Sequence, residues 1–187
     1  MAYETIILEQ YETVLLIRLN RPEALNAING KMLKELCTVL EKSSHDANVR
    51  VVIITGSEKF FAAGADIKEF VSFTMEQALE LSESGHKILS ETIQNSPKPI
   101  IAAINGYALG GGLEIAMACH LRIASENSKM GMPEVSLGLI PGYGGTQRLP
   151  QLIGKGRAMD MIMTGKMIDA NEALAFGLIN YKTSQEQ

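Results

Sequence analysis

Two glutamates are the residues of this chain whose surroundings best suit chemistry. Glu114 lies in the apolar run 113–118, directly after a triple glycine at 110–112. An unpaired charge in such a run is costly, and its surroundings can shift its pKa. Glu134 follows Pro133 further along the chain. Two carboxylates beside backbone amides that point at one spot are the groups that water addition to an activated double bond needs.

Two short turns could supply such amides. One is the Ala-Gly-Ala-Asp turn at 63–66 and the other is the triple glycine at 110–112, and each precedes an expected helix. Amides at a helix N-terminus are unsatisfied, and glycine lets a ligand approach the backbone closely. The two turns could therefore form an oxyanion hole, although their spacing in the sequence leaves open whether they converge.

The elements that must position these groups alternate between strand and helix. Residues 5–9 and 13–20 predict a hairpin, and Asn29 predicts the N-cap of an amphipathic helix. Further strands are expected at 51–55, 100–104 and 121–124, and further helices at 66–70, 75–94, 113–119, 145–153, 156–164 and 170–176, with Gly165 and Gly177 as C-caps. This alternation predicts an α/β fold with a largely parallel sheet.

Length and composition indicate one ordinary globular domain over residues 1–187. The chain is 46% hydrophobic, which suffices for a substantial core, and its polar end from Thr183 is expected to fray. A net charge of −4 disfavours a nucleic-acid-binding surface. No apolar run approaches the length of a membrane span, and no secretory leader is recognisable, so a cytoplasmic location is the default expectation.

The remaining reactive side chains indicate no other chemistry. Cys37 and Cys119 both lie in apolar segments and are expected to be reduced, buried thiols. The three histidines, His45, His86 and His120, lack the spacing of a metal site, and no serine lies in a nucleophile elbow. Neither a metal nor a separate cofactor is expected.

Taken together, five segments resemble the enoyl-CoA hydratase/isomerase family, also called the crotonase superfamily. They are Asn-Arg-Pro-Glu-Ala-Leu-Asn-Ala at 20–27, Phe-Ala-Ala-Gly-Ala-Asp-Ile-Lys at 61–68, Lys-Pro-Ile-Ile-Ala-Ala-Ile-Asn-Gly at 98–106, Ala-Leu-Gly-Gly-Gly-Leu-Glu-Ile-Ala-Met at 108–117 and Pro-Glu-Val-Ser-Leu-Gly-Leu-Ile-Pro-Gly-Tyr-Gly-Gly-Thr-Gln-Arg-Leu at 133–149. They cover nearly the whole chain in the family's order. The resemblance implies a crotonase-like fold of repeated ββα units.

The resemblance also implies roles for individual residues. Glu114 and Glu134 match the two glutamates that hold the reacting water in hydratases, and Ala65 and Gly111 match the oxyanion-hole positions. Gly142 matches a loop that closes over this water. The positions that match the coenzyme A-binding stretch are Ala62, Ala63, Ala65, Asp66, Ile67 and Lys68, of which Lys68 matches a lysine near the phosphates.

The activity that this resemblance implies is hydration of a trans-2-enoyl-CoA to the 3-hydroxyacyl-CoA, with an acyl-CoA thioester as the partner. Two alternatives stay open. Double-bond isomerisation can use the same oxyanion hole with one carboxylate. A binding or truncated subunit would hold acyl-CoA without turning it over. Family members usually continue past residue 180 into helices that support trimer or hexamer packing, so assembly and activity are expected to depend on whether the 187 residues suffice.

Overall fold

The strands form two sheets within residues 3–184, which the computed structural model describes. The larger sheet has the order β1-β2-β3-β5-β7-β10, and the smaller sheet has the order β4-β6-β8-β9. The strands of the larger sheet are β1 (Ile6–Tyr11), β2 (Val14–Leu19), β3 (Val51–Thr55), β5 (Ile100–Ile104), β7 (Leu121–Ser125) and β10 (Tyr181–Thr183). Those of the smaller sheet are β4 (Phe60–Ala62), β6 (Tyr107–Leu109), β8 (Lys129–Gly131) and β9 (Met167–Asp169).

Most neighbouring strands run parallel. β1 and β2 form the expected antiparallel hairpin, and every further pair in the larger sheet, from β2 to β10, is parallel. In the smaller sheet only β8 and β9 pair antiparallel. The prediction of an α/β fold with a largely parallel sheet is therefore confirmed.

The two strands of each successive pair enter different sheets. β3, β5 and β7 each enter the larger sheet, and the strand that follows each of them, β4, β6 or β8, enters the smaller one before a helix begins. These are the ββα units that the family resemblance implies. The helices are α1 (Gly30–His45), α2 (Ile67–Phe70), α3 (Met75–Ile88), α4 (Gly111–Ala118), α5 (Gly145–Ile153), α6 (Lys155–Thr164) and α7 (Ala170–Phe176), with 3-10 turns η1 (Pro22–Ala24) and η3 (Pro133–Leu137) and a π-helical segment η2 (Leu89–Gln94).

Several helix boundaries follow the capping residues that the sequence contains. The Asn29 side chain accepts a hydrogen bond from the Met32 amide at the start of α1, and Asp66 caps α2 in the same way. Gly165 and Gly177 adopt the left-handed conformation after α6 and α7. The expected helix 75–94 differs at its end, because its last part becomes π-helical and buries Leu89 and Ile93.

Two structural predictions made from the sequence are wrong. Thr183 is not frayed, because it lies in β10 and pairs with Ser125 of β7; residues 185–187 lie outside the described part of the chain. Cys37 is only partly buried, whereas Cys119 is buried, and both thiols are free. Thr183 is held by backbone pairing, which does not depend on the polarity of its side chain. Cys37 lies outside the buried face of α1, and its thiol contacts Glu41 and Thr92.

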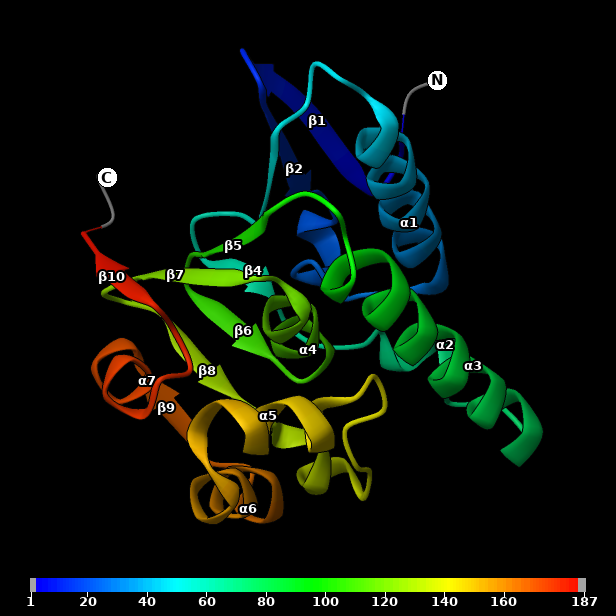
Figure 1. Ribbon diagram of the computed structural model, residues 1–187. Helices are drawn as coiled ribbons and strands as arrows, with labels where there is room; N and C mark the ends of the chain where they lie inside the picture. Colours follow the sequence, from blue (N-terminus) through cyan, green and yellow to red (C-terminus); the bar gives the residue numbers. More distant parts are fainter. Residues whose placement is uncertain (1–2, 185–187) are drawn as a thin grey trace.

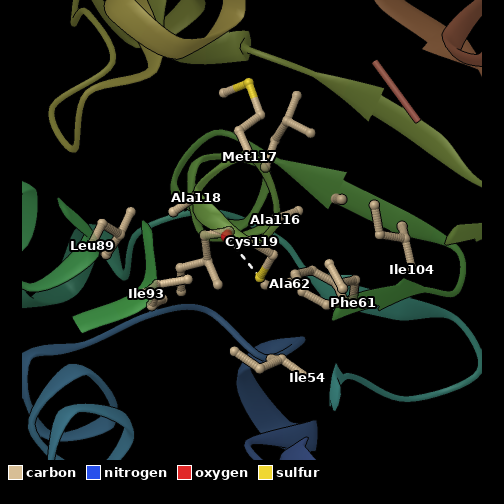
Figure 2. Close-up of a cluster of buried hydrophobic side chains, with 14 of the residues drawn as sticks. Ile54, Phe61, Ala62, Leu89, Ile93, Ile104, Ala116, Met117, Ala118 and Cys119 are labelled. Carbon is tan, nitrogen blue, oxygen red and sulfur yellow. Dashed lines mark hydrogen bonds between the residues drawn. The ribbon is translucent and has the colours of Figure 1, made fainter. Parts of the chain in front are cut away.

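Helix α4 forms the centre of the hydrophobic core. Each of its eight residues is buried, including Glu114. Figure 2 shows side chains of β3, β4, β5 and η2 gathered around this helix, with Ile54, Phe61 and Leu89 among them. A helix that is buried all round is held on every side, so the position of Glu114 is fixed by core packing.

Helix α3 is much less buried than α4, because one of its ends projects from the body of the molecule (Figure 1). Large apolar side chains in the first turns of α3 are exposed, including Met75 and Leu79, and so is Val71 at the end of α2. Across residues 3–184, none of the helices combines the length and apolar character that crossing a bilayer requires.

Gly112→Ala is expected to destabilise the protein. A Cβ at Gly112 would lie 2.5 Å from the Ala62 carbonyl oxygen and 2.7 Å from Ala62 Cβ, so α4 would have to move away from β4. Overpacking of this kind costs about 1–3 kcal/mol. The free energy of unfolding in guanidinium chloride measures this loss.

Gly156→Ala is the matched control, because it lies in α6 and its Cβ would meet nothing within 4 Å. Alanine in place of a helical glycine should stabilise the protein by about 0.5–1 kcal/mol. Equal effects of the two substitutions would show that the contact between α4 and β4 is not tight.

Candidate active site

One cavity of about 370 Å³ brings the predicted reactive groups together. Glu114 and Glu134 both line it, and so do Ala65, Gly111 and Gly142. Most of the remaining lining is apolar and comes from α2, α3, the end of η3 and the segment after it: Ile67, Phe70, Ala78, Leu81, Leu137, Leu139 and Ile140. The cavity therefore combines two carboxyl groups with an apolar wall.

Glu114 projects from α4 and is only 1% exposed. Its Oε1 accepts hydrogen bonds from the amides of Tyr143, at 2.8 Å, and Gly145, at 2.6 Å. Burial raises the pKa of Glu114 to about 7, and the nearby charge of Glu134 also raises it; the two amides and the Arg148 guanidinium act in the opposite direction. A carboxyl with this pKa can both accept and donate a proton near neutral pH.

Glu134 lies at the start of η3, and burial raises its pKa above the ordinary value. Its Oε2 is buried and has no hydrogen-bond partner among residues 3–184. Gly110 makes room for this carboxyl, because a Cβ there would lie 2.7 Å from Glu134 Oε1. The backbone φ of +46° at Gly110 also favours glycine. A buried carboxylate oxygen of this kind is suited to a small polar molecule in the cavity.

The two turns that the sequence left unplaced lie side by side. The amide nitrogen of Ala65 is 3.4 Å from the position that a Cβ on Gly111 would occupy. Among residues 3–184, the amides of Ala65 and Gly111 donate no backbone hydrogen bond outside the helices and strands. Gly111 is the first residue of α4, so its amide has no partner within the helix either. Gly64, with φ of +119°, permits the bend before Ala65.

The segment that holds Glu114 is itself held by Arg148, a residue that the sequence analysis did not select. Arg148 donates from Nη1 to the Tyr143 carbonyl at 2.7 Å, from Nε to Gln94 Oε1 at 2.9 Å and from Nη2 to Ser90 Oγ at 3.1 Å. It thereby ties the turn before α5 to η2. Glycines at 144 and 145 signal close backbone contacts, but nothing in the sequence says that Glu114 receives them.

A second contact holds the same segment from the side of α3. The hydroxyl of Ser82 donates to the carbonyl of Gly142 at 2.6 Å. Gly142, the predicted loop residue, therefore borders the cavity. Ser82 holds its carbonyl, and Arg148 holds the carbonyl of the next residue, Tyr143.

The expected coenzyme A-binding residues occupy different environments. Ala63, Ala65 and Ile67 line the cavity, whereas Ala62 is fully buried in β4 and Lys68 is exposed. The Asp66 carboxylate caps α2 and forms an ion pair with Arg21 at 2.9 Å. Their roles in binding remain predictions. Among the described residues, no group of three or more histidine, cysteine or acidic side chains could hold a metal ion.

The fold and the cavity define a protein of the crotonase class, in which Glu114, Glu134, Ala65 and Gly111 line one site. The sequence profile of the family "Enoyl-CoA hydratase/isomerase" matches residues 9–187. The chain therefore belongs to the enoyl-CoA hydratase/isomerase family.

Individual relatives are similar over nearly the whole chain. A "Probable enoyl-CoA hydratase" of Bacillus subtilis is 48% identical over 97% of this chain and 69% of its own length. The "Crotonyl-CoA hydratase" of Syntrophomonas wolfei is 46% identical over 100% of this chain and 72% of its own. The crystal structure of the enoyl-CoA hydratase from Bacillus anthracis has a TM-score of 0.92 at 43% identity, and the match covers 98% of this chain and 71% of that one.

Glu114→Gln is expected to change how stability depends on pH. The folded pKa of about 7 lies above the ordinary 4.5, so the folded state binds a proton that the unfolded state has released. Stability from this group is complete below pH 4.5 and is lost as pH rises through 7. Glutamine cannot titrate, so the variant should gain up to about 3 kcal/mol over the unsubstituted protein between pH 4.5 and 8. Urea unfolding across this range measures the difference, and a difference that does not change with pH would contradict the raised pKa.

Arg148→Gln is expected to raise the pKa of Glu114 further, because the guanidinium charge lowers it. The stabilising effect of Glu114→Gln should then keep growing up to a higher pH, and reach a larger value, in the Arg148→Gln background, because only the folded-state pKa moves. Arg157→Gln is the matched control, because Arg157 is exposed and stacks on the Phe176 ring at 4.2 Å, away from the cavity. An equal shift in both backgrounds would exclude a specific effect of Arg148.

Proposed function

We propose that this protein adds water to trans-2-enoyl-CoA thioesters and so forms 3-hydroxyacyl-CoA, in a reversible reaction. The observation that carries the proposal is the cavity in which Glu114 and Glu134 meet the amides of Ala65 and Gly111. The names of the relatives from Bacillus subtilis and Syntrophomonas wolfei support the same activity.

The amides of Ala65 and Gly111 would bind the thioester carbonyl oxygen. Negative charge gathers on this oxygen when the β-carbon is attacked and an enolate forms. Donors placed beforehand in a site that excludes water stabilise such charge, and the loss of one donor typically lowers the rate 10²–10³-fold. The start of α4 adds the partial positive charge of a helix N-terminus.

The two glutamates would share one proton between them. In the hydration direction, the oxygen of water bonds to the β-carbon while the ionised carboxyl accepts a proton from that water. The protonated carboxyl gives its proton to the α-carbon, and the π bond of the substrate breaks. One carboxyl is again ionised and one protonated, so the pair returns to its starting charge. Burial raises the pKa of both groups, which favours the state with one proton.

Coenzyme A would lie along Ala62, Ala63, Ala65, Asp66, Ile67 and Lys68, with the exposed Lys68 ammonium near its phosphates. We propose further that the protein acts in the cytoplasm as a homo-oligomer. Exposed methionines on α6 and β9, Met159, Met163 and Met167, support self-association, because apolar side chains of this size are more common at interfaces than on free surfaces. No nucleic acid, membrane, metal or separate cofactor is part of the proposed reaction.

Two other functions use the same cavity. An isomerase needs only one carboxyl to move a proton between carbons, and a binding subunit needs none. The second buried carboxyl favours hydration over both.

Loss of the enoyl-thioester absorbance with crotonyl-CoA tests the proposal. Both Glu114→Gln and Glu134→Gln should lower kcat at least 10²-fold, because each removes a proton acceptor and donor. Glu126→Gln, at an exposed glutamate outside the cavity, should leave the rate unchanged. A folded protein that binds coenzyme A but shows no hydration rate would support the binding subunit instead. Isomerisation of a 3-enoyl-CoA that one of the two glutamate variants retains and the other loses would support the isomerase.

A further inference from the structure

The aromatic ring of Tyr143 lies between glycines of two different helices. A Cβ on Gly85 in α3 would lie 2.3 Å from the ring atoms Cδ1 and Cε1, and a Cβ on Gly111 in α4 would lie 3.5 Å from Cδ2 and Cε2. The two glycines therefore face opposite edges of one ring. Tyr143 is only 5% exposed, yet it lines the cavity.

Gly85 lies in the interior of α3, where glycine weakens a helix relative to alanine. Its φ is not in the left-handed region, so the backbone conformation does not require glycine. The ring of Tyr143 accounts for it, because no side chain fits between α3 and the ring. Gly85 and Tyr143 thus form a pair of complementary size: the absence of a side chain at Gly85 of α3 leaves room for the Tyr143 ring, which comes from the turn before α5.

The pair lies beside the proposed position of the thioester. The ring is next to Gly111, whose amide would bind the carbonyl oxygen, and the amide of Tyr143 itself holds Glu114. The walls that continue from the ring are apolar and comprise Phe70, Ala78, Leu81, Leu137, Leu139 and Ile140. An acyl chain that leaves the thioester would therefore run through an apolar space that the ring bounds on the side of α3.

We propose that Tyr143, seated against Gly85, limits the length of the acyl chain that the cavity accepts and makes the protein selective for short chains. This inference rests on the proposed function. Removal of the ring would extend the apolar cavity toward Gly85 and create room for further methylene groups. Burial of each methylene corresponds to about a fourfold gain in affinity.

Binding of saturated acyl-CoA tests the inference without turnover. Dissociation constants for butyryl-, hexanoyl-, octanoyl- and decanoyl-CoA are measured by calorimetry, and kcat/KM is measured for the matching trans-2-enoyl-CoAs. Tyr143→Ala should raise the preference for decanoyl- over butyryl-CoA at least tenfold. Tyr143→Phe keeps the ring and should keep the length preference. Tyr11→Ala removes an exposed ring from β1 and should change neither quantity.

A double-mutant cycle tests the pairing itself. Gly85→Ala alone forces a contact with the ring and should lower stability, whereas Gly85→Ala in the Tyr143→Ala background should not. Additive effects would overturn the pairing. Should Tyr143→Ala not fold, Tyr143→Leu provides a smaller apolar side chain, and the same change in length preference is expected.

The outcomes separate this inference from the proposed function. A length preference that stays unchanged in a folded variant with the ring removed would overturn the inference, even where hydration proceeds. A changed preference in binding, with no hydration by any variant, would uphold the role of Tyr143 and overturn the hydratase activity.

Discussion

The burial of the Glu114 carboxyl is the constraint on which the rest of the site depends. A charged carboxylate in an apolar interior is unstable unless hydrogen bonds or proton uptake compensate for lost solvation. This protein uses both, because the amides of Tyr143 and Gly145 donate to Oε1 while burial raises the pKa to about 7. The same desolvation that costs stability therefore produces a group able to exchange protons near neutral pH.

The architecture supplies this environment through close backbone approaches. Helix α4 is buried on all sides, and Gly112 lets it lie against β4. The strands of the smaller sheet end in the turns that carry Ala65 and Gly111, so the two proposed donors are placed by the sheet and not by flexible loops. Gly110 gives space to Glu134 in the same way. The apolar core and the polar site are therefore built from the same helix.

The sequence predicted those features that depend on neighbouring residues. The hairpin, the caps at Asn29 and Asp66 and the apolar helix around Glu114 are local patterns, and family motifs identified the second glutamate. Strands β4, β6, β8, β9 and β10 were missed, because three residues are too few to show a period of two. The amides that hold Glu114 lie 29 and 31 residues further along the chain, and their approach depends on tertiary packing that no local pattern encodes.

The most direct test is an NMR titration of the carboxyl carbons in protein labelled with ¹³C-glutamate, in which the signal of Glu114 is identified by its absence from Glu114→Gln. A midpoint at about pH 7, above the ordinary 4.5 of a glutamate, is the result expected from a carboxyl held by burial against two amides. A midpoint near 4.5 would contradict it, because the carboxyl would then be solvated, and neither the proton exchange nor the pH-dependent stability could arise from its burial.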